Sequence, residues 1–286
     1  MTIAFLFPGQ GARDVLSGLK LARAWPEGAR RIALASPAEL EANGGRALER
    51  TDVLQPVLAA VCLSIHRALL SAGVTPSLVL GHSLGELVSY AAAGVISDEV
   101  AVKLASLRGA LMAREAAKHP GGLLAFASLK LATATFDSGL QLAAINAPDE
   151  VIVSGPERAL RPVVALMPAK RVPVSGAWHS DAMSGAVDEF RDALRKLTPG
   201  DARVPIIRNS DGALGHSLES LADQLTRPVQ FVAALQTAVA RGVDTFVTVG
   251  PGAVLRGLVR KNLGKSVRVH TTEDLRDFER TAAALA

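Results

Sequence analysis

Residues 78–90, LVLGHSLGELVSY, place a short apolar segment, a tight glycine-flanked turn and a helical segment end to end. The first four residues predict a buried strand, and the stretch LGELVSYAAAG predicts a helix that ends at Gly94. The turn flanks Ser83 with Gly81 and Gly85, because a side chain at either glycine would clash across so sharp a bend. A strand that turns in this way into a helix is typical of α/β proteins that hold a serine hydroxyl at the head of the helix.

Ser83 is therefore a candidate nucleophile, and the alternative is an ordinary turn with a helix-capping serine. A bare Gly-x-Ser-x-Gly arises by chance, so the flanking strand and helix carry the prediction. In this arrangement the backbone N–H of Leu84 points to where an oxyanion would form. The nucleophile interpretation also requires a base near the serine.

Strand-like runs alternate with helical stretches through the first 120 residues, which predicts a mostly parallel sheet covered by helices. The predicted strands are IAFLF and SLVLG. Long helices are predicted from VLQPVLAAVCLSIHRALLSAG and from DEVAVKLASLRGALMAREAAKH, with Ser97 as the N-cap of the second.

The middle of the chain follows a different pattern. Four strand-like pieces come in quick succession, and one clear helix, PERALRPVVALM, lies among them. This predicts a small α+β unit at residues 122–174, inserted into a large α/β domain formed by residues 1–121 and 175–286. The last part of the large domain is predicted to contain the helices AVDEFRDALRKL and FVAALQTAVARG and the strand TFVTVG.

Composition limits the class of protein. With 286 residues, 49% of them hydrophobic, the chain can bury one large α/β core or a large core and a small one. The single cysteine, Cys62, excludes an internal disulfide framework and fits a reducing cytoplasm. The net charge of +4 and the 4% of aromatic residues argue against nucleic acid as a partner, since unpaired bases stack on aromatic side chains.

The apolar start of the sequence, MTIAFLFPGQG, lacks a basic leader and a small-residue cleavage pattern, so it is predicted to be a strand. No apolar run is expected to approach the roughly 18–20 residues that span a membrane. A membrane is therefore not expected as a partner.

A serine at neutral pH needs a base, and six histidines are candidates. His179, in VPVSGAWHSDAM, follows a predicted strand and precedes a helix, at what would be the functional edge of a sheet. His82 adjoins Ser83, but on so sharp a turn its ring is expected to point elsewhere. The others have structural or polar surroundings that need no further role: His66, His119, His216 and His270. Elimination leaves His179 as the candidate base.

The long helix after Ser97 carries a charged residue on its apolar face. Arg108 is four residues after Leu104 and three before Leu111, so the three side chains share that face. An arginine there either extends its head group to solvent or meets a fixed anion. In an acyl-enzyme pocket its guanidinium would bind a carboxylate in a two-pronged geometry that lysine cannot copy. That alternative predicts a substrate with a free carboxylate as well as a thioester or ester.

Five motifs occur in order: FPGQGA at 7–12, GHSLGE at 81–86, SLRGALM at 106–112, GAWHS at 176–180 and VGPG at 249–252. With them the chain resembles, over nearly its whole length, the malonyl-CoA:acyl-carrier-protein transacylases of fatty-acid and polyketide synthesis. The resemblance implies a large α/β-hydrolase-like domain with a small ferredoxin-like domain inserted. It also implies that a malonyl group moves from malonyl-CoA to the phosphopantetheine thiol of an acyl carrier protein, without a metal or other cofactor.

The resemblance implies roles for individual residues. Ser83 would be the acylated nucleophile and His179 the general base, oriented by the backbone carbonyl of Gln224 in place of an aspartate. The backbone N–H groups of Gln10 and Leu84 would form the oxyanion hole.

The same resemblance implies the substrate side of the site. Arg108 would bind the malonyl carboxylate, in agreement with its position on an apolar helix face. The other implied pocket residues are His82, Met112, Asn146 and Trp178. The site would lie in the cleft between the two domains.

Three features depart from the family pattern. The stretch between LLAFASL and LQLAAINA is short, which predicts a stub in place of the first helix of the small domain. Arg13 stands where the family often has glutamine. Gly176 and Trp178 replace the residues usual in fatty-acid members, and GAWHS is more similar to discrete acyltransferases that serve polyketide assembly lines. A bulky Trp178 beside the histidine would narrow the pocket and favour malonyl over branched units.

Three other functions fit parts of the pattern. An acyl hydrolase of the same fold would release acyl groups to water, but simple acyl groups offer nothing for Arg108 to bind. An ordinary α/β-hydrolase esterase would need an acidic triad member, for which Asp137 or Asp149 could serve. A scaffold that only docks carrier proteins would not need Ser83 and His179.

Overall fold

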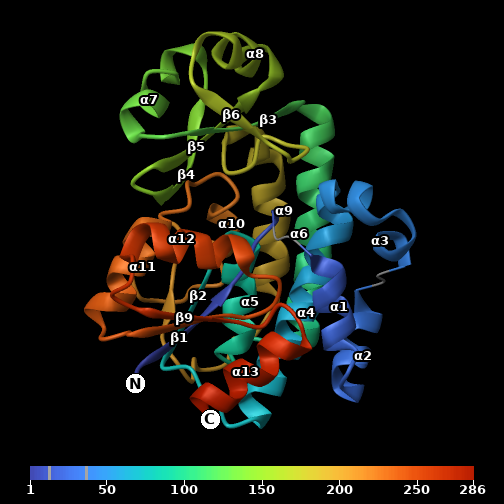
Figure 1. Ribbon diagram of the computed structural model, residues 1–286. Helices are drawn as coiled ribbons and strands as arrows, with labels where there is room; N and C mark the ends of the chain where they lie inside the picture. Colours follow the sequence, from blue (N-terminus) through green and yellow to red (C-terminus); the bar gives the residue numbers. More distant parts are fainter. Residues whose placement is uncertain (12–13, 36–37) are drawn as a thin grey trace.

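The computed structural model describes residues 1–11, 14–35 and 38–286, and its described residues form two sheets (Figure 1). The larger sheet has five strands, every neighbouring pair of which is parallel. In spatial order they are β7 (Ile206–Ile207), β2 (Leu78–Gly81), β1 (Ile3–Phe7), β8 (Thr245–Thr248) and β9 (Arg268–Thr271). All five residues of β1 are buried, as expected of a central parallel strand covered on both faces. The predicted parallel sheet is confirmed, whereas the departure at Arg13 lies outside the described residues.

Helices surround this sheet, with α4, α5 and α6 on one side and α11 and α12 on the other (Figure 1). Those before the small sheet are α1 (Val15–Ala22), α2 (Pro26–Leu34), α3 (Ala38–Asn43), the 3₁₀ helix η1 (Gly44–Glu49), α4 (Thr51–Ser71), α5 (Leu84–Ala92) and α6 (Asp98–Lys118). Those after it are η3 (Asp181–Met183), α9 (Ser184–Arg195), α10 (Ser220–Asp223), α11 (Phe231–Ala240), α12 (Ala253–Leu263) and α13 (Leu275–Leu285). The predicted cap of α6 is present, since the Ser97 side chain accepts a hydrogen bond from the N–H of Val100.

The smaller sheet is antiparallel throughout and lies at the other end of the molecule from both chain termini (Figure 1). Its strands, in spatial order, are β4 (Gln141–Ala147), β5 (Glu150–Pro156), β3 (Gly121–Phe126) and β6 (Ala169–Val172). With α7 (Leu129–Thr133) and α8 (Glu157–Leu166) the chain order is β-α-β-β-α-β, the ferredoxin-like arrangement. The helix α7 has five residues and is followed by a short 3₁₀ turn, η2 (Phe136–Ser138), so the predicted stub is present.

The chain enters and leaves the small sheet on neighbouring strands. The entering strand β3 and the leaving strand β6 are hydrogen-bonded partners, with Leu123 opposite Val172. The small sheet also has its own apolar core, which includes Leu124, Phe126 and Val153. The segment is thus joined to the rest of the chain by two adjacent connections, and its strand β4 also forms backbone hydrogen bonds with Val229.

The expectation that no apolar run approaches membrane-spanning length is wrong for α4. This helix has 21 residues and is long and apolar enough to cross a membrane, but 83% of its apolar window is buried inside the protein. It packs along α6 and also contacts α1, α2 and α5, so it is apolar because it is a core helix. Cys62 lies on it, and burial raises the pKa of its thiol, as expected of an inert core cysteine.

His66, also on α4, is a buried histidine without a polar contact. Its ring packs edge-on against Phe5 and Phe7, with centroids 5.8 and 5.9 Å away, and neither ring nitrogen has a hydrogen-bond partner among the described residues. Burial lowers the pKa of His66 to about 3, with a further contribution from Arg67. The folded protein therefore holds this imidazole neutral.

This burial makes folding sensitive to acid. Between about pH 6.5 and pH 3 the unfolded chain binds a proton at His66 that the folded chain does not, so the free energy of unfolding decreases as the pH falls through that range. Replacing His66 by leucine should reduce the loss between pH 7 and pH 5 by about 2 kcal/mol, measured by urea unfolding. Replacing His119 by glutamine is the control for removing a histidine whose side chain folding leaves exposed. Equal losses in the wild type and the His66→Leu variant would contradict this account.

Candidate active site

Ser83 stands in a sharp turn between β2 and α5, as the sequence predicts. It is the N-cap residue of α5, with φ 53° and ψ −110°. A Cβ atom on Gly81 would lie 2.0 Å from the carbonyl carbon of Gly85, and one on Gly85 would lie 1.9 Å from the carbonyl oxygen of Phe7. Both positions therefore require glycine, because the chain segments approach too closely for any side chain.

Two of the predicted site residues have unusual backbone conformations. Apart from glycines, the described residues include three with positive φ: Asp14, Ser83 and His179. Such conformations cost about 1–3 kcal/mol each and persist only where the surrounding structure holds them. Asn209 stabilises the backbone conformation of Ser83. Its Oδ1 accepts a hydrogen bond from the Ser83 N–H (2.6 Å), and its Nδ2 donates to the carbonyl oxygen of Gly81 (2.6 Å).

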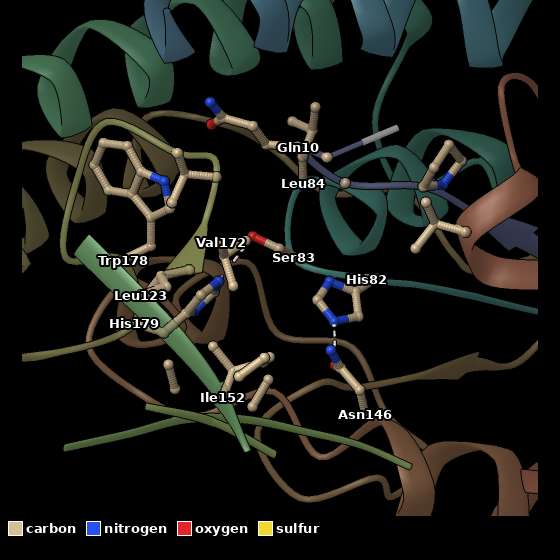
Figure 2. A pocket seen from close by; sticks show the side chains of 18 of the residues that line it. Gln10, His82, Ser83, Leu84, Leu123, Asn146, Ile152, Val172, Trp178 and His179 are labelled. Carbon is tan, nitrogen blue, oxygen red and sulfur yellow. Dashed lines mark hydrogen bonds between the residues drawn. The ribbon is translucent and has the colours of Figure 1, made fainter. Parts of the chain in front are cut away.

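The structure brings Ser83 and His179 into contact, with 2.9 Å between the serine Oγ and the histidine Nε2 (Figure 2). On the other side of the ring, Nδ1 lies 2.9 Å from the carbonyl oxygen of Gln224 and 3.1 Å from that of Arg227. Carbonyl oxygens only accept hydrogen bonds, so Nδ1 carries the ring proton. The lone pair of Nε2 then faces the serine hydroxyl and can accept its proton.

His179 is also held in its neutral form. Burial lowers its pKa to about 3, and the nearby charge of Arg108 contributes in the same direction, although hydrogen bonding to the Gln224 carbonyl opposes them. At neutral pH the ring is therefore neutral, with Nε2 unprotonated, which is the form that can take a proton from Ser83.

Among the described residues, backbone carbonyls and not an acidic side chain are the hydrogen-bond partners of Nδ1. Asp149 pairs instead with Lys261 (3.6 Å), and 64% of its side chain is exposed. Asp137 is an exposed residue of the 3₁₀ turn in the small sheet's helical layer. Because backbone carbonyls occupy Nδ1 of His179, the esterase alternative with Asp137 or Asp149 as the orienting acid is wrong.

The ring of His82 turns away from the serine, as expected for the residue that precedes it. Its Nε2 lies 2.8 Å from Oδ1 of Asn146, whose own Nδ2 donates to Glu150 (3.2 Å) (Figure 2). Phe231 packs against the other side of the ring, with centroids 5.5 Å apart. His82 and Asn146 thus form one wall of the site and are not in contact with the Ser83 hydroxyl.

Arg108 is buried, with 2% of its surface exposed, so the alternative in which its head group extends to solvent is wrong. Its Nη1 donates to Oε1 of Gln55 (2.7 Å), and its Nη2 donates to Oε1 of Gln224 (2.9 Å) and to Oγ of Ser83 (3.1 Å). Burial lowers its pKa to about 10, opposed by Glu86, so the guanidinium stays charged at neutral pH.

All the hydrogen-bond partners of Arg108 are neutral. None of its nitrogens forms an ion pair with a carboxylate of the described residues. The carboxylate of Glu86 acts on Arg108 only at longer range, across the side chain of Gln224, so an anion bound directly beside the guanidinium would lower the cost of burying its charge. The cavity therefore has a positively charged group directly beside the Ser83 hydroxyl.

These residues surround a cavity of about 370 Å³ (Figure 2). Nine of the ten predicted site residues line it: Gln10, His82, Ser83, Leu84, Arg108, Met112, Asn146, Trp178 and His179. The tenth, Gln224, acts through its contacts with His179 and Arg108. Strands of the small sheet complete the lining with Leu123, Ala143 and Ile152, so the cavity lies between the two sheets. Among the described residues, no three His, Cys, Asp or Glu side chains gather closely enough to hold a metal ion.

The proposed oxyanion donors lie at the start of α5 and after β1. The N–H of Leu84 is the first of α5, where backbone N–H groups lack partners within the helix and the helix dipole is positive. Gln10 belongs to the loop after β1, which approaches so closely that a Cβ on Gly9 would lie 2.4 Å from the carbonyl oxygen of His82. This approach places Gln10 beside Ser83 in the cavity wall.

Four contributing residues are missing from the sequence prediction: Gln55, Glu86, Asn209 and Arg227. Glu86 belongs to the GHSLGE motif, so its position next to the turn was a signal that could have been followed. Gln55 lies on the buried face of α4, where a polar residue is unusual. Asn209 and Arg227 follow no pattern in the sequence near them.

The fold and this site define a protein that brings a serine hydroxyl, a neutral histidine and a buried arginine to one cavity, as an acyl transferase requires. The family model of the acyl transferase domain matches residues 4–279, and the chain belongs to that family.

Similar proteins agree with this family. The malonyl CoA-acyl carrier protein transacylase of Bacillus subtilis is 32% identical over 285 residues, which cover 91% of this chain and 90% of that protein. The crystal structure of the malonyl-CoA:acyl carrier protein transacylase of Xanthomonas oryzae superposes with a TM-score of 0.91 at 27% identity and covers both chains completely. The malonyl-transacylase of a type II polyketide system, solved with its acyl-carrier protein, gives a TM-score of 0.90 at 27% identity over 99% of this chain and 100% of that one.

Proposed function

We propose that this acyltransferase moves a malonyl group from malonyl-CoA to the phosphopantetheine thiol of an acyl carrier protein. The observation that carries the proposal is the buried guanidinium of Arg108 beside Ser83, which forms no direct ion pair with the described residues. A malonyl thioester presents a carboxylate to the arginine and a carbonyl carbon to the serine at the same time. The transacylases among its relatives support the same reaction.

The first half-reaction forms an acyl-enzyme. The Ser83 oxygen attacks the thioester carbonyl carbon as its proton passes to Nε2 of His179, which is 2.9 Å away. The N–H groups of Leu84 and Gln10 hold the resulting oxyanion. The carbon–sulfur bond then breaks, the proton on His179 goes to the departing sulfur of coenzyme A, and a malonyl ester remains on Ser83.

The second half-reaction reverses these steps with a different thiol. The phosphopantetheine thiol gives its proton to Nε2 of His179 and attacks the ester carbonyl carbon. When the carbon–oxygen bond breaks, the proton passes from His179 to Ser83. The malonyl group leaves on the carrier protein, and the enzyme returns to its starting protonation state.

Arg108 separates this function from hydrolysis of simple acyl groups. An acetyl or longer alkyl chain would leave the guanidinium buried without an anion, whereas a malonyl group neutralises it. A hydrolase of the same fold that acts on carrier-protein thioesters remains the second candidate, and it differs in whether water or a thiol removes the malonyl group.

The proposal also includes a division of the chain into two domains and a cellular compartment. We divide the chain into a large domain of residues 1–121 and 175–286 and a small domain of residues 122–174, with the cavity between them. The buried thiol of Cys62 and the thioester substrates favour the cytoplasm. Neither nucleic acid nor a membrane enters the proposed reaction.

The intact mass of the protein, measured after mixing with malonyl-CoA and again after adding a phosphopantetheinylated carrier protein, tests this function. A malonyl adduct that forms and then passes to the carrier is the expected result. An adduct lost mainly to water would favour the hydrolase. No adduct from malonyl-CoA, with labelling by acetyl-CoA instead, would overturn the role of Arg108.

Trp178 is expected to limit the size of the acyl group that the cavity accepts. Its side chain is 4% exposed and lines the cavity, and its ring lies over Gly176, where a Cβ would be 2.3 Å from it. Replacing Trp178 by serine should open space for a methyl branch and raise the ratio of methylmalonyl to malonyl transfer by about 10-fold, the scale at which one methyl group is discriminated. Mass spectrometry of the carrier protein with both thioesters present measures this ratio. Trp178→Phe is the control, with a smaller rise, and an unchanged ratio in the serine variant would contradict the role.

A further inference from the structure

Glu86 is a buried acid that touches neither the cavity nor the serine hydroxyl. It lies in the first turn of α5, directly after the turn that carries Ser83, and 1% of its surface is exposed. Its Oε2 accepts two hydrogen bonds, from Nε2 of Gln224 (2.6 Å) and from the backbone N–H of Asn209 (3.1 Å). A carboxylate is rarely buried without hydrogen bonds, so these two donors stabilise Glu86 in its buried position.

The first of these partners connects Glu86 to both His179 and Arg108. The side-chain Oε1 of Gln224 accepts from Nη2 of Arg108 (2.9 Å), and its backbone carbonyl faces Nδ1 of His179 (2.9 Å). With its Nε2 on Glu86, the amide of Gln224 can take only one orientation, because a reversed amide would point its oxygen at the carboxylate.

The second partner connects Glu86 to the serine. Asn209 is fixed by its backbone N–H on Glu86, and its side chain holds the strained turn at both the Ser83 N–H and the Gly81 carbonyl. Oε2 of Glu86 is therefore linked to the N–H of Ser83 through Asn209 and to the side chain of Arg108 through Gln224.

We infer that Glu86 is a positioning residue for the transfer reaction: through Gln224 and Asn209 it sets the places of His179, Arg108 and Ser83 relative to one another. The inference rests on the proposed function. Glu86 acts only through these two residues and contacts no substrate.

The ionised form of Glu86 is the one that positions. A carboxylate accepts from both donors, whereas the neutral acid is a weaker acceptor and adds a donor of its own among groups that already donate. In the part of the chain that the structure describes, three titratable or charged groups face it: Tyr90 on its own helix, Arg108 from α6, and Arg208 from the segment after β7. Burial raises the pKa of Glu86 to about 7, while its bond from Gln224 and the two arginines lower it.

Glu86→Gln tests this role, because it keeps the shape and removes the charge. We expect acylation by malonyl-CoA at pH 8, followed by rapid-quench mass spectrometry, to slow by about 10- to 100-fold. This is the loss of activity typical when a residue that hydrogen-bonds to a metal-binding side chain is replaced, and Glu86 acts on the site residues in a similarly indirect way. The wild-type rate should rise with pH through about 7, and the variant should lack this rise, so that their ratio shrinks at pH 6. Loss of the rise in Glu86→Gln assigns it to Glu86 and not to His179, whose pKa burial lowers.

A matched control and a double variant separate positioning from a general loss of structure. Glu115→Gln removes another buried carboxylate, bound to Arg114 and Lys118 and outside this network, and should leave the acylation rate and its pH profile unchanged. Gln224→Ala keeps the backbone carbonyl but removes the link to Glu86. If Glu86 acts mainly through that link, Glu86→Gln combined with Gln224→Ala should slow acylation little more than Gln224→Ala alone.

The outcomes are distinct. A wild type that takes no malonyl group overturns the proposed function itself. A wild type that is malonylated, with Glu86→Gln matching it in rate and pH profile, overturns only the positioning role. If the variant does not fold, the wild-type profile decides alone, and a rate that is flat between pH 6 and pH 8 rejects the inference.

Discussion

Replacing Ser83 by alanine should abolish the malonyl adduct and lower transfer to the carrier protein by about 10⁴-fold or more, the scale seen when a serine nucleophile is removed from comparable sites. The Ser83 oxygen is 2.9 Å from Nε2 of a histidine that is held neutral and 3.1 Å from a charged guanidinium. None of the other predicted site residues combines a hydroxyl with such a base. The measurement is intact mass for the adduct and carrier-protein mass for transfer.

The matched control for this variant is Ser64→Ala. Ser64 is also a buried serine, but its hydroxyl donates to the Ala60 carbonyl inside α4 and lies away from the cavity. This variant should retain the adduct and the transfer rate. An adduct that survives in Ser83→Ala would show that malonyl is attached elsewhere and would remove Ser83 from the mechanism.

Replacing Arg108 by alanine should lower kcat/KM for malonyl-CoA relative to acetyl-CoA by about 10²- to 10⁴-fold. The guanidinium is expected to make two charge-assisted hydrogen bonds to the malonyl carboxylate, each worth about 1.5–3 kcal/mol, and acetyl-CoA has no group to receive them. Because Arg108 also donates to Ser83, both substrates lose some rate, and the ratio isolates the carboxylate. Acylation rates with each thioester give that ratio.

Two further variants sharpen the result for Arg108. Arg108→Lys keeps the positive charge but loses the planar guanidinium that can bind a carboxylate through two hydrogen bonds. Its ratio of malonyl-CoA to acetyl-CoA kcat/KM should lie between those of the wild type and the alanine variant. Arg114→Ala removes an arginine of the same helix whose side chain is 40% exposed and bound to Glu115 and Glu189, and it should leave the ratio unchanged. An unchanged ratio in Arg108→Ala would mean that the carboxylate binds elsewhere.

The elements that local patterns define were predicted from the sequence. The strand β2, the turn at Ser83 and the capped helix α6 follow from short apolar runs, glycines and a serine cap, each of which acts over a few residues. The strands β7 and β9 were not predicted. The first has only two residues, and the second lies at the sheet edge, where three of its four residues are at least partly exposed, so neither has a readable apolar period.

The candidate site divides in the same way. Ser83 and Arg108 could be located from the turn and from helix periodicity, and the resemblance to a family supplied Gln10, Gln224 and the pocket residues. Asn209 could not be found because it meets Ser83 across 126 positions of the chain, and no local rule connects a loop asparagine to a distant turn. The helix α4 was predicted, but its membrane-spanning length and hydropathy were not, since charged and polar residues interrupt its apolar pattern in the sequence.

The pairing of β3 with β6 has a consequence for how such a chain can change over evolution. Because the entrance and exit of the small sheet are hydrogen-bonded neighbours, residues can be gained or lost between them without moving the strands that carry Ser83. The five-residue helix α7 lies in this part of the chain. A cassette of this kind can adapt its outer surface to a new partner, or be exchanged whole with that of a relative, while the chemistry on the other side of the cavity stays the same.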